Sequence, residues 1–88
     1  MTLDRRIEEL VAVGASVTAN CGPCVKFHTK EARESGASAE EIAAAIAVGK
    51  AVRKGAASRM DRTVEELGAS EGKASEATSC CGGAAEAR

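Results

Sequence analysis

The residues best suited to chemistry in this 88-residue chain are four cysteines and one histidine. Cys21-Gly22-Pro23-Cys24 is a CxxC pair, a spacing at which two thiols can form a disulfide with little backbone movement. His28 follows Cys24 by four residues, so the two side chains share a face if the segment is a helix. The imidazole can accept a proton from a nearby thiol or, as imidazolium, stabilise its thiolate. The pattern indicates a redox-active dithiol with its own base.

The residues alone do not decide which thiol is the reactive one. Proline fits best in the first turn of a helix, so Pro23 places Cys21 at a helix N-terminus, where the dipole favours a thiolate. The spacing of His28 favours Cys24 instead. Two alternatives to redox chemistry also stand: zinc binding by the CxxC pair with His28 or with Cys80 and Cys81, and simple burial as small apolar side chains.

The second cysteine pair, Cys80-Cys81, lies near the end of the sequence in a Gly-flanked segment. These thiols could be incidental, or they could bind a soft ion such as mercury, copper(I) or trivalent arsenic. They could also act as a swinging dithiol that passes electrons or an ion to the CxxC pair. In this last respect the segment resembles the C-terminal cysteine pair of mercuric reductases.

Three helices are expected to position these residues, and the fold class is all-α because no segment alternates with period two. The first should run from about Leu3 to Ala19 with Thr2 as N-cap, and the second from about Pro23 to Ser35, ending at Gly36. Ser38 and Glu41 form a capping-box signature for a third helix that reaches Leu67, with a possible kink at Gly55.

Small residues are frequent on the third helix and predict a close approach to a neighbouring helix. Its charged residues are most simply a solvated face with i,i+4 pairs; they are Lys50, Arg53, Lys54, Arg59, Asp61, Arg62, Glu65 and Glu66. Gly and Pro between the cysteines are also found in thioredoxin, but nothing strand-like precedes Cys21, so that fold is not expected. Residues 1–67 are predicted to form the helical domain and 68–88 a flexible Gly/Ala/Ser-rich tail.

The composition predicts a thin core. Alanine supplies 19 of the 39 hydrophobic residues, so the fold should be completed by association with further copies of the chain. No apolar run approaches the roughly 20 residues that span a bilayer. The net charge of −1 and the near absence of aromatic residues argue against nucleic acid as a partner. With no signal-peptide pattern, we expect a cytoplasmic protein.

The segment ELVAVGASVTANCGPC, from Glu9 to Cys24, followed by His28, resembles the alkyl hydroperoxidase D core of the carboxymuconolactone decarboxylase superfamily. The family pattern has a Glu twelve residues before the CxxC and a His four residues after its second Cys, and this sequence reproduces both spacings. The segment from Lys30 to Ile42 is also similar to the family's continuation. The resemblance covers roughly residues 3–58.

The resemblance implies an all-helical fold that assembles as trimers or hexamers, and a thiol-dependent peroxidase or disulfide oxidoreductase activity. Cys24 would be the peroxidatic thiolate, Cys21 the resolving thiol and His28 the proton relay, with Glu9 orienting His28. Peroxide would oxidise Cys24 to a sulfenic acid, which Cys21 would convert to a disulfide. An external dithiol reductant, such as a protein carrying a dihydrolipoyl group, would reset the enzyme, and no other cofactor is implied. On spacing alone, without the resemblance, Glu9 is more simply an ordinary exposed glutamate.

The alternative function uses the same dithiol together with Cys80 and Cys81 to bind or transfer a thiophilic metal or metalloid. Lactone decarboxylation is not expected, because the resemblance does not extend to a substrate pocket for it.

Overall fold

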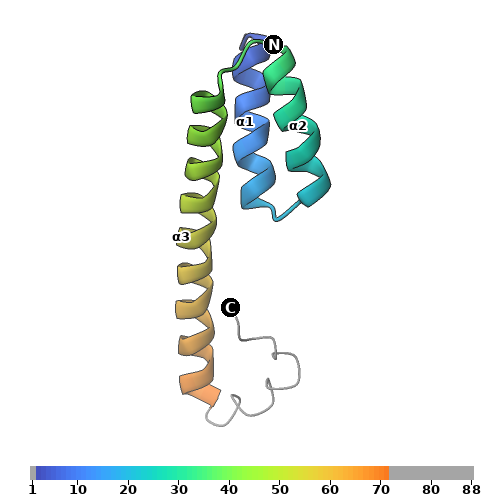
Figure 1. The fold of residues 1–88 in the computed structure, drawn as a ribbon. Coiled ribbons are helices and arrows are strands. Elements are labelled where there is room, and N and C mark those ends of the chain that lie inside the picture. Colours follow the sequence, from blue (N-terminus) through green and yellow to red (C-terminus); the bar gives the residue numbers. More distant parts are fainter. Residues whose placement is uncertain (1, 72–88) are drawn as a thin grey trace. The chain divides into compact units, whose positions relative to one another are not determined.

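The structure, a computed structural model, describes residues 2–71, most of which are helical, with no strand in that range. The helices are α1 (Arg5–Thr18), α2 (Gly22–Glu34) and α3 (Ala39–Glu71) (Figure 1). The expected all-α fold class and the order of three helices are confirmed.

The chain divides into two compact units, the first ending at Ala56 and the second beginning at Ala57. The first unit contains α1, α2 and the beginning of α3, and it carries every candidate site residue up to His28. The helix assignment of α3 continues without a break through Gly55 and reaches Glu71, four residues beyond the predicted end at Leu67. Cys80, Cys81 and most of the predicted tail lie outside the described residues.

The start of α1 differs from the prediction. Asp4, not Thr2, is the N-cap: its side chain accepts a hydrogen bond of 2.9 Å from the backbone N–H of Ile7. A capping side chain has to satisfy an N–H in the first turn, and Asp4 stands three residues before Ile7 at the position that does so. Helix α1 therefore begins at Arg5, two residues later than expected from the apolar periodicity.

The connection between α2 and α3 follows the predicted signals. Gly36 has a φ of +99°, and its N–H and that of Ala37 donate to carbonyl oxygens of Arg33 and Ala32, which is a Schellman ending. The predicted capping box is also present: the Ser38 hydroxyl accepts from Glu41 N–H at 3.0 Å, and Glu41 accepts from Ser38 N–H at 3.1 Å.

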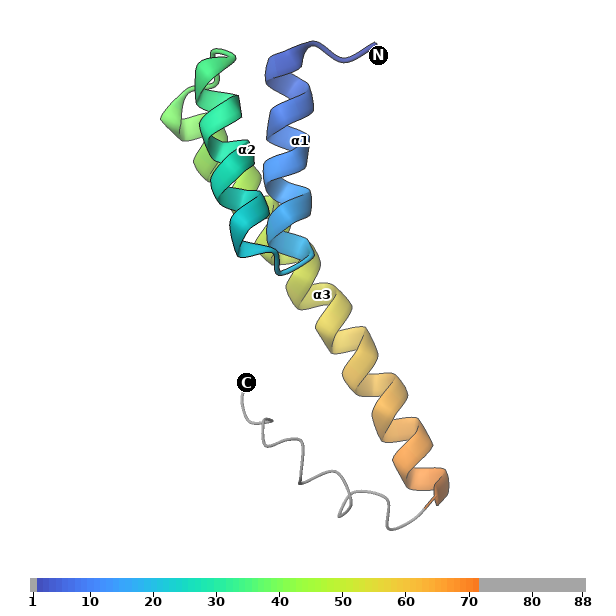
Figure 2. The ribbon, with the colours of Figure 1, turned by 90° about the vertical axis from the view of Figure 1, so that its right-hand side faces the viewer.

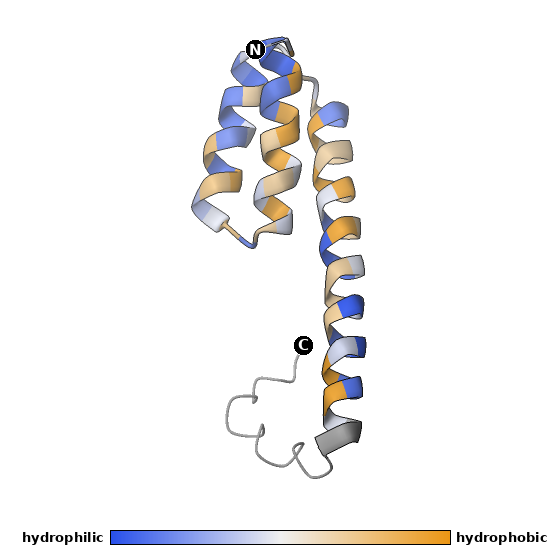
Figure 3. Ribbon diagram, turned by 180° about the vertical axis from the view of Figure 1, so that it is seen from behind, coloured by the Kyte–Doolittle hydropathy of each residue, from blue (hydrophilic) through white to orange (hydrophobic). Residues whose placement is uncertain are grey.

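The core of the first unit is small. Its buried apolar side chains are Val13, Ala32, Ala37 and Ile42, and Leu10, Val25, Ala45 and Ile46 pack around them. Figure 3 shows hydrophilic residues gathered at the start of α1 and mostly apolar residues along the rest of it. The prediction of a thin core is confirmed for this part of the chain, whereas self-association is not tested by a single chain.

Two glycines let α1 and the beginning of α3 approach closely (Figure 2). A Cβ atom built on Gly49 would lie 2.5 Å from the carbonyl oxygen of Gly14 and 2.9 Å from the Cβ of Val17. A Cβ on Gly14 would lie 3.1 Å from the carbonyl oxygen of Ala45. Thr18 joins the two helices at the same level, since its hydroxyl lies 3.1 Å from the carbonyl oxygen of Gly49. The close approach predicted for the small residues of the third helix thus occurs within the chain.

None of the helices in the described range is both long and apolar enough to cross a membrane.

Candidate active site

The turn between α1 and α2 places Cys21. Asn20 adopts a left-handed conformation with a φ of 59°, and the N–H groups of Asn20 and Cys21 donate to the carbonyl oxygens of Val17 and Ser16, both at 3.0 Å. This is a second Schellman ending, with Asn in the place that glycine usually takes. The chain therefore reverses within two residues and delivers Cys21 directly to the N-cap of α2.

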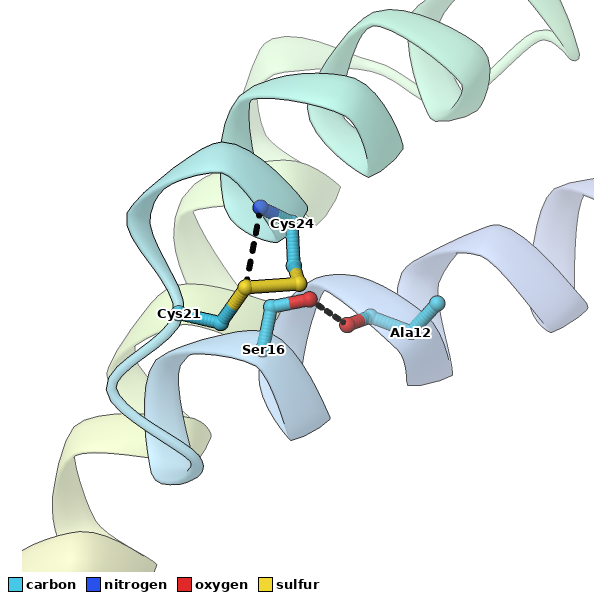
Figure 4. Close-up of a disulfide and its surroundings, with 4 residues drawn as sticks. All are labelled: Ala12, Ser16, Cys21 and Cys24. Atoms are coloured by element: carbon cyan, nitrogen blue, oxygen red, sulfur yellow. Dashed lines mark hydrogen bonds between the residues drawn. A yellow bond between two sulfur atoms is a disulfide. The ribbon is translucent and has the colours of Figure 1, made fainter.

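Cys21 and Cys24 are joined by a disulfide, with their Cα atoms 5.2 Å apart. The N–H of Cys24 donates to the sulfur of Cys21 at 3.2 Å, so this sulfur acts as the capping group of α2 (Figure 4). Both cysteines are half-buried. The helix N-terminus thus directs a backbone N–H at the Cys21 sulfur, an arrangement that also suits a thiolate at that position.

Glu9 and His28 meet across the interface of α1 and α2, which lie side by side (Figure 2). The Oε1 atom of Glu9 lies 2.7 Å from Nδ1 of His28. Glu9 is only 9% exposed, and Arg5 Nε donates to its second oxygen at 3.2 Å. The hydrogen bond from His28, followed by that from Arg5, lowers the pKa of Glu9 below its ordinary value of 4.5. Glu9 is therefore a buried, charged partner of His28 and not an ordinary exposed glutamate.

The contact with Glu9 fixes the role of each nitrogen of His28. A carboxylate accepts, so Nδ1 carries the proton, and in the neutral ring Nε2 is then the free acceptor. His28 follows Cys24 by one helical turn on α2. Among the described residues His28 forms no hydrogen bond to either sulfur, and its ring instead packs edge-on against Phe27, with centroids 5.0 Å apart.

The four predicted site residues thus form two pairs: Cys21 and Cys24 share a disulfide, and Glu9 contacts His28. Helix α2 carries Cys24 and His28, so it joins the two pairs. A half-buried imidazole that contacts a carboxylate and lies one helical turn from a cysteine can move protons to and from sulfur. Such an arrangement suits thiol–disulfide exchange and the oxidation of a thiolate.

Sequence reasoning missed three residues that hold this arrangement. Asn20 supplies the left-handed turn, a role that an Asn directly after a helical pattern could have indicated. Arg5 joins Glu9 to Glu31, since its guanidinium also lies 2.8 Å from that carboxylate. Ser16 is 6% exposed, donates to the carbonyl oxygen of Ala12 at 2.7 Å and points toward the disulfide in Figure 4. No sequence signal distinguishes Ser16 from an ordinary helix serine.

The metal alternatives gain no support from the part of the chain that the structure describes. Within residues 2–71, no three His, Cys, Asp or Glu side chains are grouped so that they could hold a metal ion. Cys80 and Cys81 lie outside that range, so soft-ion binding through them stays a prediction.

Comparison with known proteins identifies the family. The sequence profile of the carboxymuconolactone decarboxylase family matches residues 2–62, which is more than half of the chain. The chain belongs to the carboxymuconolactone decarboxylase family. The resemblance seen in the sequence is confirmed, and family membership together with a disulfide-bonded CxxC pair is compatible with a redox role.

A relative of this family member is a Paracoccus denitrificans protein described as "Uncharacterized protein 4 in cox locus". The two sequences are 42% identical over 55 residues, which are 62% of this chain and 50% of the relative. The chain thus matches about half the length of that relative. No solved structure matches the chain.

Proposed function

We propose that this protein is a thiol-dependent peroxidase or disulfide oxidoreductase of the carboxymuconolactone decarboxylase family. The observation that carries the proposal is the 2.7 Å contact between Glu9 and His28, placed on the same helix pair as the Cys21–Cys24 disulfide. A buried carboxylate can orient an imidazole, and an imidazole one helical turn from a thiol can transfer protons to and from its sulfur.

In the reduced protein, Cys24 is the attacking thiolate. Its sulfur takes one oxygen of a hydroperoxide ROOH, the O–O bond breaks, and the alkoxide leaves as ROH after it takes a proton. Cys24 is then a sulfenic acid. The thiol of Cys21 attacks the Cys24 sulfur, releases water and closes the disulfide. A dithiol reductant returns both sulfurs to thiols and is itself oxidised to a disulfide.

His28 is the proton relay in this scheme. Its Nε2 accepts the proton of the Cys24 thiol and returns one to the leaving oxygen. Glu9 is a positioning residue, because it holds Nδ1 protonated and its negative charge stabilises the imidazolium that forms between the two transfers.

The test is to mix fully reduced, metal-free protein with one equivalent of an organic hydroperoxide and to locate lost thiols by alkylation and mass spectrometry. We expect rapid loss of two thiols and a Cys21–Cys24 disulfide. Cys21→Ser should stop at a sulfenic acid on Cys24 that dimedone traps, whereas Cys24→Ser should react slowly. If the thiols of the wild-type protein survive for minutes, the peroxidase proposal is wrong.

Two matched variants test the relay. Glu9→Gln keeps the shape of the side chain but removes its charge, and Glu34→Gln makes the same change at an exposed carboxylate that pairs with Lys30. We expect the first to slow the oxidation of Cys24 about ten- to a hundredfold and the second to leave it unchanged. Equal rates in the two variants would remove Glu9 from the mechanism.

We further propose that the chain self-associates. A groove of about 460 Å³ between α1 and the beginning of α3 is lined almost entirely by apolar residues. Val11, Val48 and Val52 on its sides are 53–62% exposed, although the core of this unit buries only four apolar side chains. A second copy would cover this surface and supply the burial that a small domain lacks.

A further inference from the structure

A shallow depression of about 440 Å³ lies beside the disulfide, within the first compact unit. Its walls are the end of α1, the start of α2 and residues 46–53 of α3. It is lined by Ser16, Val17, Asn20, Cys21, Gly22, Val25, Ile46, Lys50 and Arg53. Cys21 belongs to this lining and Cys24 does not, so Cys21 is the cysteine of the pair that borders the depression.

The charges of the lining have one sign. Lys50 and Arg53 stand three residues apart on α3, on the same side of the helix, and the lining contains no acidic residue. Among the residues that the structure describes, neither forms a salt bridge, whereas Arg5, Arg6 and Lys30 each pair with a glutamate. The rim of the depression therefore carries positive charge, which no carboxylate among residues 2–71 pairs with.

Arg53 is held in place by the turn that delivers Cys21. One guanidinium nitrogen donates to the side-chain oxygen of Asn20 at 3.2 Å and to the carbonyl oxygen of Val17 at 3.4 Å. These acceptors lie at the C-terminus of α1, whose dipole favours a cation. Two contacts leave other N–H groups of the guanidinium free to bind an anion. Lys50 is exposed and lines the same depression.

We propose that this depression binds the thiol reductant of the disulfide, that the reductant carries a carboxylate or similar anionic group close to its sulfur, and that it attacks Cys21. The proposal rests on the redox function proposed above and specifies its reductant. Lys50 and Arg53 would bind the anionic group, and Val17, Val25 and Ile46 would contact the carbon chain between that group and the thiol.

The reductant thiolate attacks the sulfur of Cys21, a new S–S bond forms, and the Cys21–Cys24 bond breaks. The electron pair of the broken bond leaves on Cys24 as a thiolate, which takes its proton from the relay at His28. A second thiol of the reductant then attacks the reductant's own sulfur and releases Cys21 as a thiolate. Two electrons pass from the dithiol to the protein, and the reductant becomes a disulfide.

Matched small thiols test the charge preference. The oxidised full-length protein is reduced with 3-mercaptopropionate, 2-mercaptoethanol or cysteamine, which are anionic, neutral and cationic. Each rate is divided by the thiolate concentration and by the rate of the same thiol with a small neutral disulfide. We expect a three- to tenfold preference for the anionic over the cationic thiol, because exposed ion pairs contribute little each. The preference should shrink at high salt.

The matched variants are Lys50→Glu and Lys54→Glu, which make the same charge change on the same exposed helix surface. Only Lys50 lines the depression. We expect Lys50→Glu to abolish or invert the preference and Lys54→Glu to leave most of it. Equal effects of the two variants, or no preference in the wild-type protein, would overturn the anion site.

The attacked sulfur is identified by a monothiol, since it cannot resolve its own mixed disulfide. After 3-mercaptopropionate reacts, iodoacetamide caps the released thiol, and fragmentation of the peptide that carries both cysteines locates each group. We expect the adduct on Cys21 and the alkyl group on Cys24. An adduct on Cys24 would overturn this inference while leaving the proposed peroxidase reaction intact. A disulfide that no thiol reduces would overturn the proposed function itself.

Discussion

The contact between Gly14 and Gly49 gives a prediction whose magnitude can be worked from the structure. In Gly49→Ala, the new Cβ would stand 2.5 Å from the carbonyl oxygen of Gly14 and 2.9 Å from the Cβ of Val17. Both are well inside van der Waals contact, and the nearer atom is backbone, which cannot turn away. Helices α1 and α3 must therefore move apart at this point, and overpacking of this kind costs about 1–3 kcal/mol.

The matched control is Gly55→Ala, six residues further along the same helix. A Cβ at Gly55 would meet nothing within 4 Å. Each substitution gains up to about 1 kcal/mol of helix propensity, so the difference between the two variants isolates the steric cost. We expect Gly55→Ala to be slightly more stable than the wild-type protein and Gly49→Ala to be about 1–3 kcal/mol less stable than Gly55→Ala.

The assay is urea unfolding followed by circular dichroism, at one protein concentration for all variants because self-association would shift the midpoint. Gly14→Ala should fall between the other two, since its Cβ would lie 3.1 Å from the nearest oxygen. In thermal unfolding, each kcal/mol corresponds to about 4–8 °C for a domain of this size. If Gly49→Ala were as stable as Gly55→Ala, the reasoning from the close helix contact would be refuted.

Three further perturbations test other parts of the molecule. The pKa of Glu9 is lowered in the folded state, chiefly by the hydrogen bond from His28. Charged Glu9 therefore stabilises the fold above pH 4.5, and this contribution is lost as the pH falls through the lowered pKa. Urea titrations should therefore show Glu9→Gln less stable than wild type at neutral pH and a smaller difference in acid; a gap that widens in acid would contradict this. Asn20→Val puts a β-branched residue at a φ of 59° and should lose about 1–3 kcal/mol in the same assay, whereas Asn20→Gly should cost little; similar losses would argue against the left-handed turn. Val48→Glu should reduce the mass seen in sedimentation equilibrium relative to wild type, and an unchanged mass would remove the apolar groove from the interface.

Local signals were sufficient for most of the fold. The capping box at Ser38 and the glycine ending at Gly36 depend on residues within five positions of one another, so a short stretch of sequence is enough to predict them. The prediction of Thr2 as N-cap was wrong because the apolar pattern locates a helix well but fixes its first residue only to within about two positions. Asp4 is the residue with a side chain at the right distance from Ile7 N–H.

The candidate site was predictable only in part. Cys21, Cys24 and His28 are neighbours in sequence, so their spacing predicts a shared helix terminus without any knowledge of packing. The charged residues of the third helix were predicted to be a solvated face, and the pattern contains nothing that separates Lys50 and Arg53 from Lys54. What distinguishes Lys50 and Arg53 from Lys54 is that they line the depression beside Cys21, which forms where α1, α2 and α3 meet.

The sequence by itself determined the helices, the dithiol and its histidine, and the family, because each depends on residue types at fixed short spacings. The tertiary structure decided that Glu9 reaches His28 across 19 positions and that Gly49 lies against Gly14, since both contacts depend on how the helices cross. It also placed two cations in the lining of the depression that Cys21 borders. Crossing geometry is set by packing of side chains distant in sequence, and no local pattern encodes it.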